Sequence, residues 1–380
     1  MKSHFLLDEN IIYLNHAAVA PWPIVTRDAV IAFANENTSI GSKNYKLWMK
    51  TEKQLKQKLM QLINAESIDE IALLKNTSEG LSLIAQGIPF DKGDNIVIPA
   101  EEFPSNKVVW QALKIQGVEV RLVPVDDIDH PEQALINAMD EHTRLLSCSS
   151  VQFARGLLLD VNLIGSACKQ NNTLFCVDAI QSLGAMTFDA QACQADFVVA
   201  DGHKWMCGPE GTALFYCRKQ RQHLLRLTQH GWHMLKSAFE FSHENIDQPL
   251  EQQVVENARR FESGSPNMMG IAALNASLGL LLTIGIDNIQ TKIIANTEYL
   301  LNQLASRADI TVISSTKPGS YAGIVTFIKH RVDNEKLYQF LMANNVICAN
   351  RGGGIRFSPH FYTEQTAIAK ALKLVDNYTG

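Results

Sequence analysis

An amine and a carboxylate each follow a short apolar run in the middle of this chain. Asp178 ends the run Leu174–Val177, and Lys204 comes shortly after the run Phe197–Ala200. If both runs are buried strands, they deliver the two groups to one edge of a sheet. A lysine amine forms an imine with an aldehyde, and a carboxylate keeps a pyridine nitrogen protonated so that the ring can accept electrons. The pair is therefore typical of an enzyme that uses pyridoxal phosphate.

The residues around this pair alternate between short β-rich runs and helical stretches. We expect strands at 95–99, 118–125, 144–149, 173–178, 196–200 and 213–216, and helices at 106–115, 131–139 and 161–169. Strands that are apolar throughout and separated by helices indicate a mostly parallel sheet covered on both faces. Ligands bind at the carboxyl ends of such strands, which is where the carboxylate and the amine are expected.

The pattern changes after about residue 285. A long helix at 289–305 is expected to lead into strands at 310–314 and 323–328, a helix at 334–344, a strand at 346–348 and a last helix from residue 363. This pattern predicts a smaller α+β unit. We therefore divide the chain into a large domain, 14–285, and a small domain, 286–380, which residues 1–13 join.

Composition excludes several classes of protein. The 380 residues carry a net charge of -5, whereas nucleic-acid binding needs a concentrated basic face. The apolar stretch 278–286 is broken by glycine and threonine, so we expect no membrane span, and no signal peptide is recognised. The 7 scattered cysteines suit reduced thiols. We expect a soluble, cytoplasmic protein that binds neither nucleic acid nor membrane.

Two further motifs are weak. His230 and His233 lie close in sequence, but no companion at ligand spacing follows, so we expect no metal site. No G-x-G-x-x-G follows the first strand, which argues against a nicotinamide-dependent dehydrogenase.

Several segments together resemble one family. They read YLNHAA at 13–18, VDAIQ at 177–181, GHKWMCGPEG at 202–211 and RFSPH at 356–360. In their order and separations they resemble the class V aminotransferases, fold-type I pyridoxal phosphate enzymes that include cysteine desulfurases, selenocysteine lyases and isopenicillin N epimerase-like proteins. The resemblance covers nearly the whole chain. It implies an α/β fold with a large, mostly parallel seven-stranded-type sheet domain and a smaller α+β C-terminal domain.

The resemblance also implies roles around the cofactor ring. Lys204 would form the imine and then move the substrate's α-proton, and burial would lower its pKa toward neutrality. Asp178 would pair with the ring nitrogen, although an Asp after a strand is also a common helix N-cap. Gln181 would reach the ring hydroxyl, and Gln152 the same oxygen or the imine, unless they are solvent-facing. Phe103 would stack on the ring, or would be a core residue.

Further residues would hold the phosphate and the substrate. Thr77 and Ser78 precede a helical stretch and would bind the phosphate at its N-terminus, where a capping box is the alternative. His203 would add a phosphate contact or pack against the sheet. Ser265 would reach the phosphate of a neighbouring subunit, which implies a homodimer with shared active sites. The resemblance assigns the α-carboxylate of an amino-acid substrate to Arg356, with Asn15 nearby.

The sequence departs from the family pattern in two places. Cysteine desulfurases carry a nucleophilic cysteine shortly before the substrate arginine, but residues 350–355 read NRGGGI. Cys348 lies nearby in an apolar run, where a thiol is usually inert. Asp201 replaces a serine near the phosphate, and its role is open.

These residues favour an enzyme that acts at the α- or β-carbon of an amino acid. Aminotransferase and C–S or β-lyase chemistry share the same first step, so the motifs do not separate them. Epimerase-like and desulfurase-like activity are the alternatives within the family, and a non-catalytic cofactor-binding protein is the alternative outside enzymes. Residues from several loops are candidates for the substrate pocket wall: Trp22, Tyr45, Trp205, Trp232 and Phe361.

Overall fold

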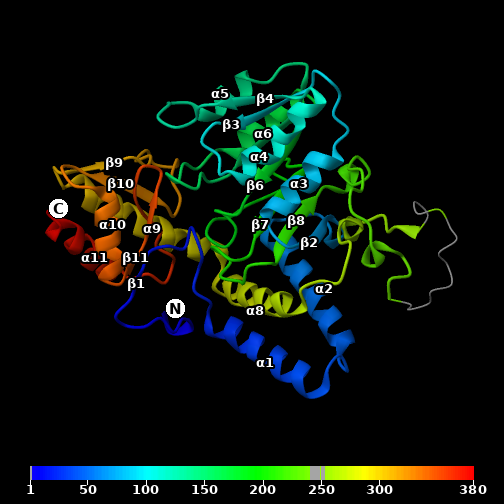
Figure 1. Ribbon diagram of the computed structural model, residues 1–380, viewed down its shortest axis with the longest axis horizontal. Helices are drawn as coiled ribbons and strands as arrows, with labels where there is room; N and C mark the ends of the chain where they lie inside the picture. The colour runs from blue at the N-terminus through cyan, green and yellow to red at the C-terminus, as the bar shows by residue number, and fades with distance from the viewer. Residues whose placement is uncertain (1, 240–248, 250–252) are drawn as a thin grey trace.

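The computed structural model describes residues 2–239, 249 and 253–380, and its centre is a seven-stranded sheet (Figure 1). The strand order is β2-β8-β7-β6-β5-β3-β4, and β8 alone runs in the direction opposite to the other strands of this sheet. The strands are β2 (Ile71–Leu74), β3 (Asn95–Pro99), β4 (Glu119–Val123), β5 (Thr143–Ser149), β6 (Leu174–Asp178), β7 (Phe197–Asp201) and β8 (Ala213–Cys217). The predicted mostly parallel sheet is therefore confirmed; the strand at 95–99 is placed to the residue, and the strand expected at 173–178 begins one residue later, at Leu174.

The chain up to Ile284 also contains helices and 3-10 turns. The helices are α1 (Ile24–Ile40), α2 (Tyr45–Leu62), α3 (Thr77–Gly87), α4 (Ser105–Gln111), α5 (Pro131–Asn137), α6 (Val161–Gln170) and α8 (Met268–Ile284). The 3-10 turns are η1 (Lys2–His4), η2 (Ile68–Glu70), η3 (Ala112–Gln116), η4 (Lys219–Arg221), η5 (Trp232–Met234) and η6 (Ala258–Phe261). The helix expected at 106–115 is thus divided, since the chain tightens into η3 after Gln111.

Alternate side chains of each central strand enter two different hydrophobic clusters. Phe175 and Val177 of β6 belong to one cluster, whereas Leu174 and Cys176 belong to the other. The two-residue period of a strand therefore gives the sheet two buried faces, as its uniformly apolar sequence predicts. Helix α3 packs close to β7 because Gly80 has no side chain: an added Cβ would lie 2.7 Å from Val199 Cγ1.

The C-terminal part forms a second, smaller unit (Figure 1). Its antiparallel sheet has the order β12-β13-β10-β9. Its elements are α9 (Ile286–Ala305), β9 (Ile310–Val312), β10 (Val325–Lys329), α10 (Asn334–Ala343), β11 (Val346–Ile347), β12 (Ala349–Arg351), β13 (Gly354–Phe357) and α11 (Gln365–Asn377). The N-terminal strand β1 (Ile12–Tyr13) pairs in parallel with β11, so residues 12–13 attach to this unit. This pairing agrees with the proposed division, whose boundaries stay a prediction.

Helices α8 and α9 meet at Gly285, where their axes bend by 81°. Within the described residues, no single helix combines the length and apolarity needed to cross a bilayer. Length and composition pass that test only for the bent pair taken together.

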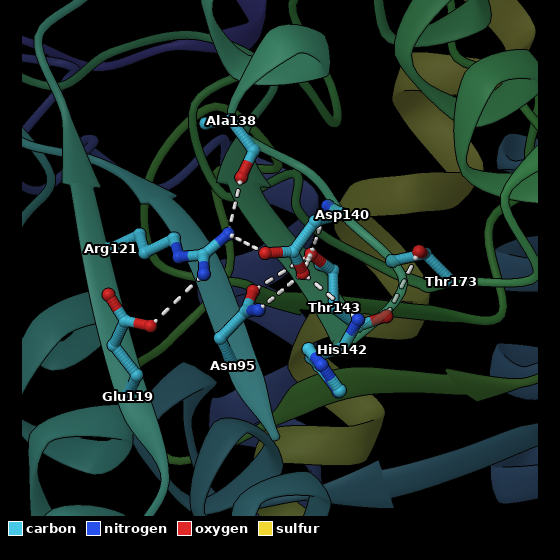
Figure 2. A network of polar contacts seen from close by, with 8 residues as sticks. All are labelled: Asn95, Glu119, Arg121, Ala138, Asp140, His142, Thr143 and Thr173. Atoms are coloured by element: carbon cyan, nitrogen blue, oxygen red, sulfur yellow. Dashed lines mark hydrogen bonds and ion pairs between the residues drawn. The ribbon is translucent and has the colours of Figure 1, made fainter. Parts of the chain in front are cut away.

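A network of polar contacts connects strands of the large sheet at the edge opposite the carboxyl ends of the strands (Figure 2). The carboxylate of Asp140 accepts a hydrogen bond of 2.7 Å from Asn95 Nδ2 and lies 2.7 Å from Arg121 Nη1. Thr143 Oγ1 donates to Asn95 Oδ1 at 2.8 Å. These contacts tie together the starts of β3, β4 and β5, so their role is to hold strand ends in register.

Candidate active site

A cavity of about 320 Å³ opens at the carboxyl ends of the central strands. Most of the sequence-predicted residues meet there, and they come from both units of the chain. The predicted members of its lining are Thr77, Ser78, Phe103, Asp178, Gln181, His203, Lys204 and Arg356. Ala17 and Ala18, from the segment after β1, complete one wall.

Lys204 lies in a turn just after β7 and is in the cavity wall. Burial lowers the pKa of its ammonium to about 8; the carboxylate of Asp178 opposes this shift, and the charge of Arg356 adds to it. The Nζ atom lies 5.8 Å from the centre of the Phe103 ring. A substantial fraction of this amine is therefore neutral near physiological pH and able to attack an aldehyde carbon.

Asp178 ends β6 and is only 3% exposed. Its Oδ2 accepts a hydrogen bond of 2.7 Å from Asn106 Nδ2, and its Oδ1 accepts one of 2.9 Å from the backbone N–H of Ile180. The residues that follow form turns and no helix, so the alternative of a helix N-cap does not apply. A fixed, buried carboxylate in this place can face a protonated ring nitrogen.

The N-terminus of α3 enters the cavity beside Lys204. Asn76 caps this helix, because its Oδ1 accepts from the N–H of Glu79 at 2.9 Å. The capping role therefore falls to Asn76, and the hydroxyls of Thr77 and Ser78 remain in the cavity wall. Thr77 Oγ1 accepts from the backbone N–H of Asp201 at 3.1 Å. Helix N–H groups and hydroxyls together are suited to a phosphate.

Asp201, whose role the sequence leaves open, lies in the cavity wall beside His203. Its Oδ2 is 3.1 Å from His203 Nδ1, and its buried Oδ1 has no hydrogen-bond partner among the described residues. The imidazole thus stands next to this carboxylate at the end of the cavity where Thr77 lies. A protonated His203 would offset the negative charge of Asp201 beside a phosphate.

Arg356 projects from β13 into the same cavity. Its Nη1 donates to the carbonyl of Phe153 at 2.6 Å and its Nη2 to Asn15 Oδ1 at 3.4 Å, whereas its buried Nε has no partner in the part of the chain that the structure describes. Burial, with the neighbouring charge of Arg351, lowers its pKa to about 10. Arg351 and Arg356 both line this cavity, and two guanidinium groups in one cavity can bind an anionic ligand.

Three predicted cofactor-binding residues, Gln181, Gln152 and Ser265, have other contacts or line another cavity in this structure. Gln181 lines the cavity, but its Nε2 donates to the carbonyl of Ala17 and its Oε1 accepts from Trp205 Nε1. Gln152 is absent from the described lining, and its amide is used inside a turn, where Oε1 accepts from two backbone N–H groups. Ser265 lines a separate cavity of about 410 Å³. The roles of these three residues stay predictions.

Sequence reasoning missed residues of the turn after β3. Glu102, Ser105 and Asn106 flank the predicted Phe103. Phe103 and Ser105 line the cavity, whereas Glu102 and Asn106 form hydrogen bonds with residues of its wall. Glu102 accepts from both the N–H and the hydroxyl of Ser149, and Ser105 Oγ lies 2.8 Å from Ser78 Oγ. The position of this turn at the carboxyl end of a strand was the available signal.

All seven cysteines lie in the described part of the chain and are buried. Burial raises the pKa of the Cys348 thiol to about 12, only partly offset by Arg356. Among the described residues that line the cavity there is no cysteine. In this conformation, no thiolate is available to a substrate held in the cavity.

None of the five proposed pocket-wall aromatics appears among the described residues of the lining. Trp205 and Phe361 are core residues, at 1% and 4% exposure, and Trp22 lines a separate apolar groove. Trp232 and Tyr45 lie in η5 and α2, outside the lining. These five assignments are therefore wrong for this cavity: Trp205 and Phe361 fill the interior, whereas Trp22 and Trp232 are exposed elsewhere on the chain.

A buried charged cluster lies outside the cavity. Lys56 Nζ is 2.9 Å from Glu52 Oε1 and 2.7 Å from Glu262 Oε1, and His233 Nδ1 is 3.4 Å from Glu262 Oε2. Two carboxylates and an imidazole this close resemble a metal-ligand set. The ammonium of Lys56 already lies within ion-pair distance of both carboxylates, so we assign the cluster a structural role.

The groups around the main cavity fit pyridoxal phosphate. An amine with a lowered pKa serves the aldehyde, a buried carboxylate serves the ring nitrogen, and a helix N-terminus with hydroxyls serves the phosphate. The buried Arg356 Nε and Asp201 Oδ1, which find no partner within residues 2–239, 249 and 253–380, point to a polar ligand in the cavity.

Comparison with known proteins gives a consistent result. Residues 12–367 match the family model described as aminotransferase class-V. The chain is similar to a probable cysteine desulfurase of Methanothermobacter thermautotrophicus, at 31% identity over 97% of this chain and 95% of the relative.

Two solved structures show the same fold. One is a cysteine desulfurase of Thermococcus onnurineus, with a TM-score of 0.87, 22% identity and coverage of 99% and 96% of the two chains. The other is the cystine C–S lyase C-DES in complex with its product, cysteine persulfide, with a TM-score of 0.88, 22% identity and coverage of 97% and 98%. At this identity, they support the fold alone.

Proposed function

Because the chain belongs to the class-V aminotransferase family and its cofactor is pyridoxal phosphate, we propose that it cleaves the carbon–sulfur bond of a cysteine-derived amino acid by β-elimination. The observation that carries this proposal is the lining of the cavity: it holds an imine-forming lysine and an arginine for a carboxylate, but no described cysteine. A desulfurase passes sulfur to a protein thiol, whereas an eliminating lyase needs none.

When bound, the cofactor withdraws electrons from the α-carbon of the amino acid. Arg356 binds the α-carboxylate through charge-assisted hydrogen bonds and so fixes the substrate's orientation. Lys204 Nζ, neutral in part near pH 7, accepts the α-proton. The Cβ–S bond then breaks, its electron pair leaves with sulfur, and hydrolysis of the remaining fragment yields pyruvate and ammonia.

The second guanidinium favours a substrate with a further anionic group. Arg351 is exposed at the mouth of the cavity and close enough to lower the pKa of Arg356. Cystine carries a second carboxylate beyond its disulfide, and C-DES, a structural neighbour, is a cystine C–S lyase. We therefore regard cystine as the first substrate to test.

A product assay separates the possible reactions. The protein loaded with pyridoxal phosphate is incubated with cystine, with cysteine, and with alanine plus a 2-oxo acid. We expect pyruvate and ammonia from cystine, with the same rate in Cys348→Ala and no product in Lys204→Ala. Alanine formed from cysteine, and lost in Cys348→Ala, would instead establish desulfuration. A new amino acid in the third mixture would establish transamination.

We also propose a homodimer with shared sites. Ser265 belongs to a loop that begins at Glu262. This loop lines a cavity that is separate from the cavity of Lys204 in the same chain. A second copy would bring this loop to the phosphate end of its partner's site. Light scattering should give twice the monomer mass, and Ser265→Ala should weaken cofactor binding without changing that mass.

A further inference from the structure

We propose that Asn106 is a positioning residue for Asp178, and that it holds this carboxylate in the orientation that the cofactor ring requires. The inference rests on the proposed role of Asp178 at the ring nitrogen. Asn106 is absent from the described cavity lining, so it acts only through Asp178.

The contact between the two side chains has one possible direction. Asn106 is 1% exposed and Asp178 is 3% exposed, and Nδ2 lies 2.7 Å from Oδ2. A carboxylate only accepts hydrogen bonds, so the amide nitrogen must face it. Together with the N–H of Ile180, this bond engages both oxygens of the carboxylate and fixes its plane.

The same orientation leaves the other amide atom without a partner. Asn106 Oδ1 is buried and makes no hydrogen bond among the described residues. An unpaired buried acceptor destabilises a fold, and an apolar side chain of similar size would avoid that cost. The amide of Asn106 is therefore explained by the hydrogen bond that it donates to Asp178. The stability of the fold alone explains it poorly.

The surroundings of Asp178 show why such a donor is needed. Glu102, from the same turn as Asn106, is a second buried carboxyl: burial raises its pKa to about 7, and repulsion from Asp178 adds to the increase. Burial also raises the pKa of Asp178, and Asn106 is the largest opposing influence, ahead of Ile180 and Lys204. Without the amide, Asp178 would more readily take up a proton and lose its charge toward the ring.

The test compares three variants. Asn106→Leu removes the donor and the unpaired acceptor together, Asp178→Asn removes the charge, and Gln111→Leu makes a matched change at an exposed position of α4. Each protein is examined for thermal unfolding without cofactor, for the dissociation constant of pyridoxal phosphate, and for the pH dependence of the bound cofactor's visible spectrum.

We expect Asn106→Leu to remain folded without cofactor at the temperature of the binding assay, because the stability lost when Asp178 Oδ2 loses its donor is partly offset by removal of the unpaired Oδ1. Its dissociation constant for pyridoxal phosphate should rise by about 10- to 100-fold, the usual value of a hydrogen bond to a charged group. The spectral transition should move in the same direction as in Asp178→Asn. Gln111→Leu should match wild type in all three measurements.

Two results would overturn the inference while leaving the role of Asp178 intact. One is an Asn106→Leu protein with wild-type affinity and spectrum while Asp178→Asn is impaired. The other is a loss of stability without cofactor that accounts for the whole effect. If Asp178→Asn itself binds pyridoxal phosphate with an unchanged spectrum, the role of Asp178 is wrong and the inference fails with it.

Discussion

The buried imidazole of His16 should make the stability of this protein sensitive to mild acid. His16 belongs to the segment after β1 and is fully buried against the segment after β13. Its Nδ1 lies 2.8 Å from the carbonyl of Ser358, which can only accept, so in the neutral ring Nε2 accepts from the hydroxyl of Tyr362 at 2.7 Å. Burial lowers the pKa of this ring from 6.5 to about 4, against the effect of Ser358.

The direction and size of this pH effect on stability follow from the linkage between proton binding and folding. Below about pH 6.5 the unfolded chain binds a proton at this ring and the folded chain does not, so stability falls as the pH falls toward the folded pKa. The loss works out at about 2 kcal/mol between about pH 7 and about pH 5, and about 3 kcal/mol by about pH 4. His360, buried in the same cluster with its pKa also lowered, adds to the wild-type dependence.

The assay is urea unfolding of the protein without cofactor at a series of pH values. His16→Gln should lose less stability than wild type on acidification, by about 2 kcal/mol at about pH 5. His142→Gln, which removes an exposed imidazole, is the control. Parallel loss of stability in wild type and His16→Gln would refute the reasoning, because the His16 ring would then contribute nothing to the difference in proton uptake.

Two further predictions concern ionic contacts away from the cavity. Lys56→Met leaves the buried carboxylates of Glu52 and Glu262 without their cation and should lower the free energy of unfolding by about 3–5 kcal/mol in urea titrations; a loss below about 1 kcal/mol would contradict the buried-charge argument. Asp140→Asn should lower it by about 1 kcal/mol near neutral pH. Because the contacts of Asp140, first with Asn95, hold the pKa of its carboxyl below 3.8, that difference should shrink as the pH falls below about 4, and a constant difference would count against it.

The central sheet could be predicted well because its strands carry their own signal. The runs around Cys176 and Val199 are apolar on both faces, a pattern that few other elements show. Strand β2 was missed, since its four residues lie between a 3-10 turn and the N-terminus of α3 and offer little pattern to recognise. Helices α1 and α2 were missed too, and α1 has only Thr26 fully buried, so its sequence shows little helical periodicity.

The candidate site was predicted as far as its residues follow recognisable segments. Asp178, Lys204 and Arg356 meet in one cavity, as their positions at strand ends and their resemblance to the family imply. Gln152 shows the limit of such reasoning: its amide could equally reach a ligand or close a turn, and only the backbone geometry shows that it closes a turn. Asn106 was missed because its function depends on a contact between residues 72 positions apart.

The pairing of Asn15 with Arg356 spans 341 positions of the chain, and β1 is held by β11 over a similar distance. During synthesis, almost the entire polypeptide must therefore be made before the contact between Asn15 and Arg356 can form. The large sheet can form earlier, while the ribosome is still adding the last segment. The cavity is consequently completed only near the end of the synthesis and folding of each chain.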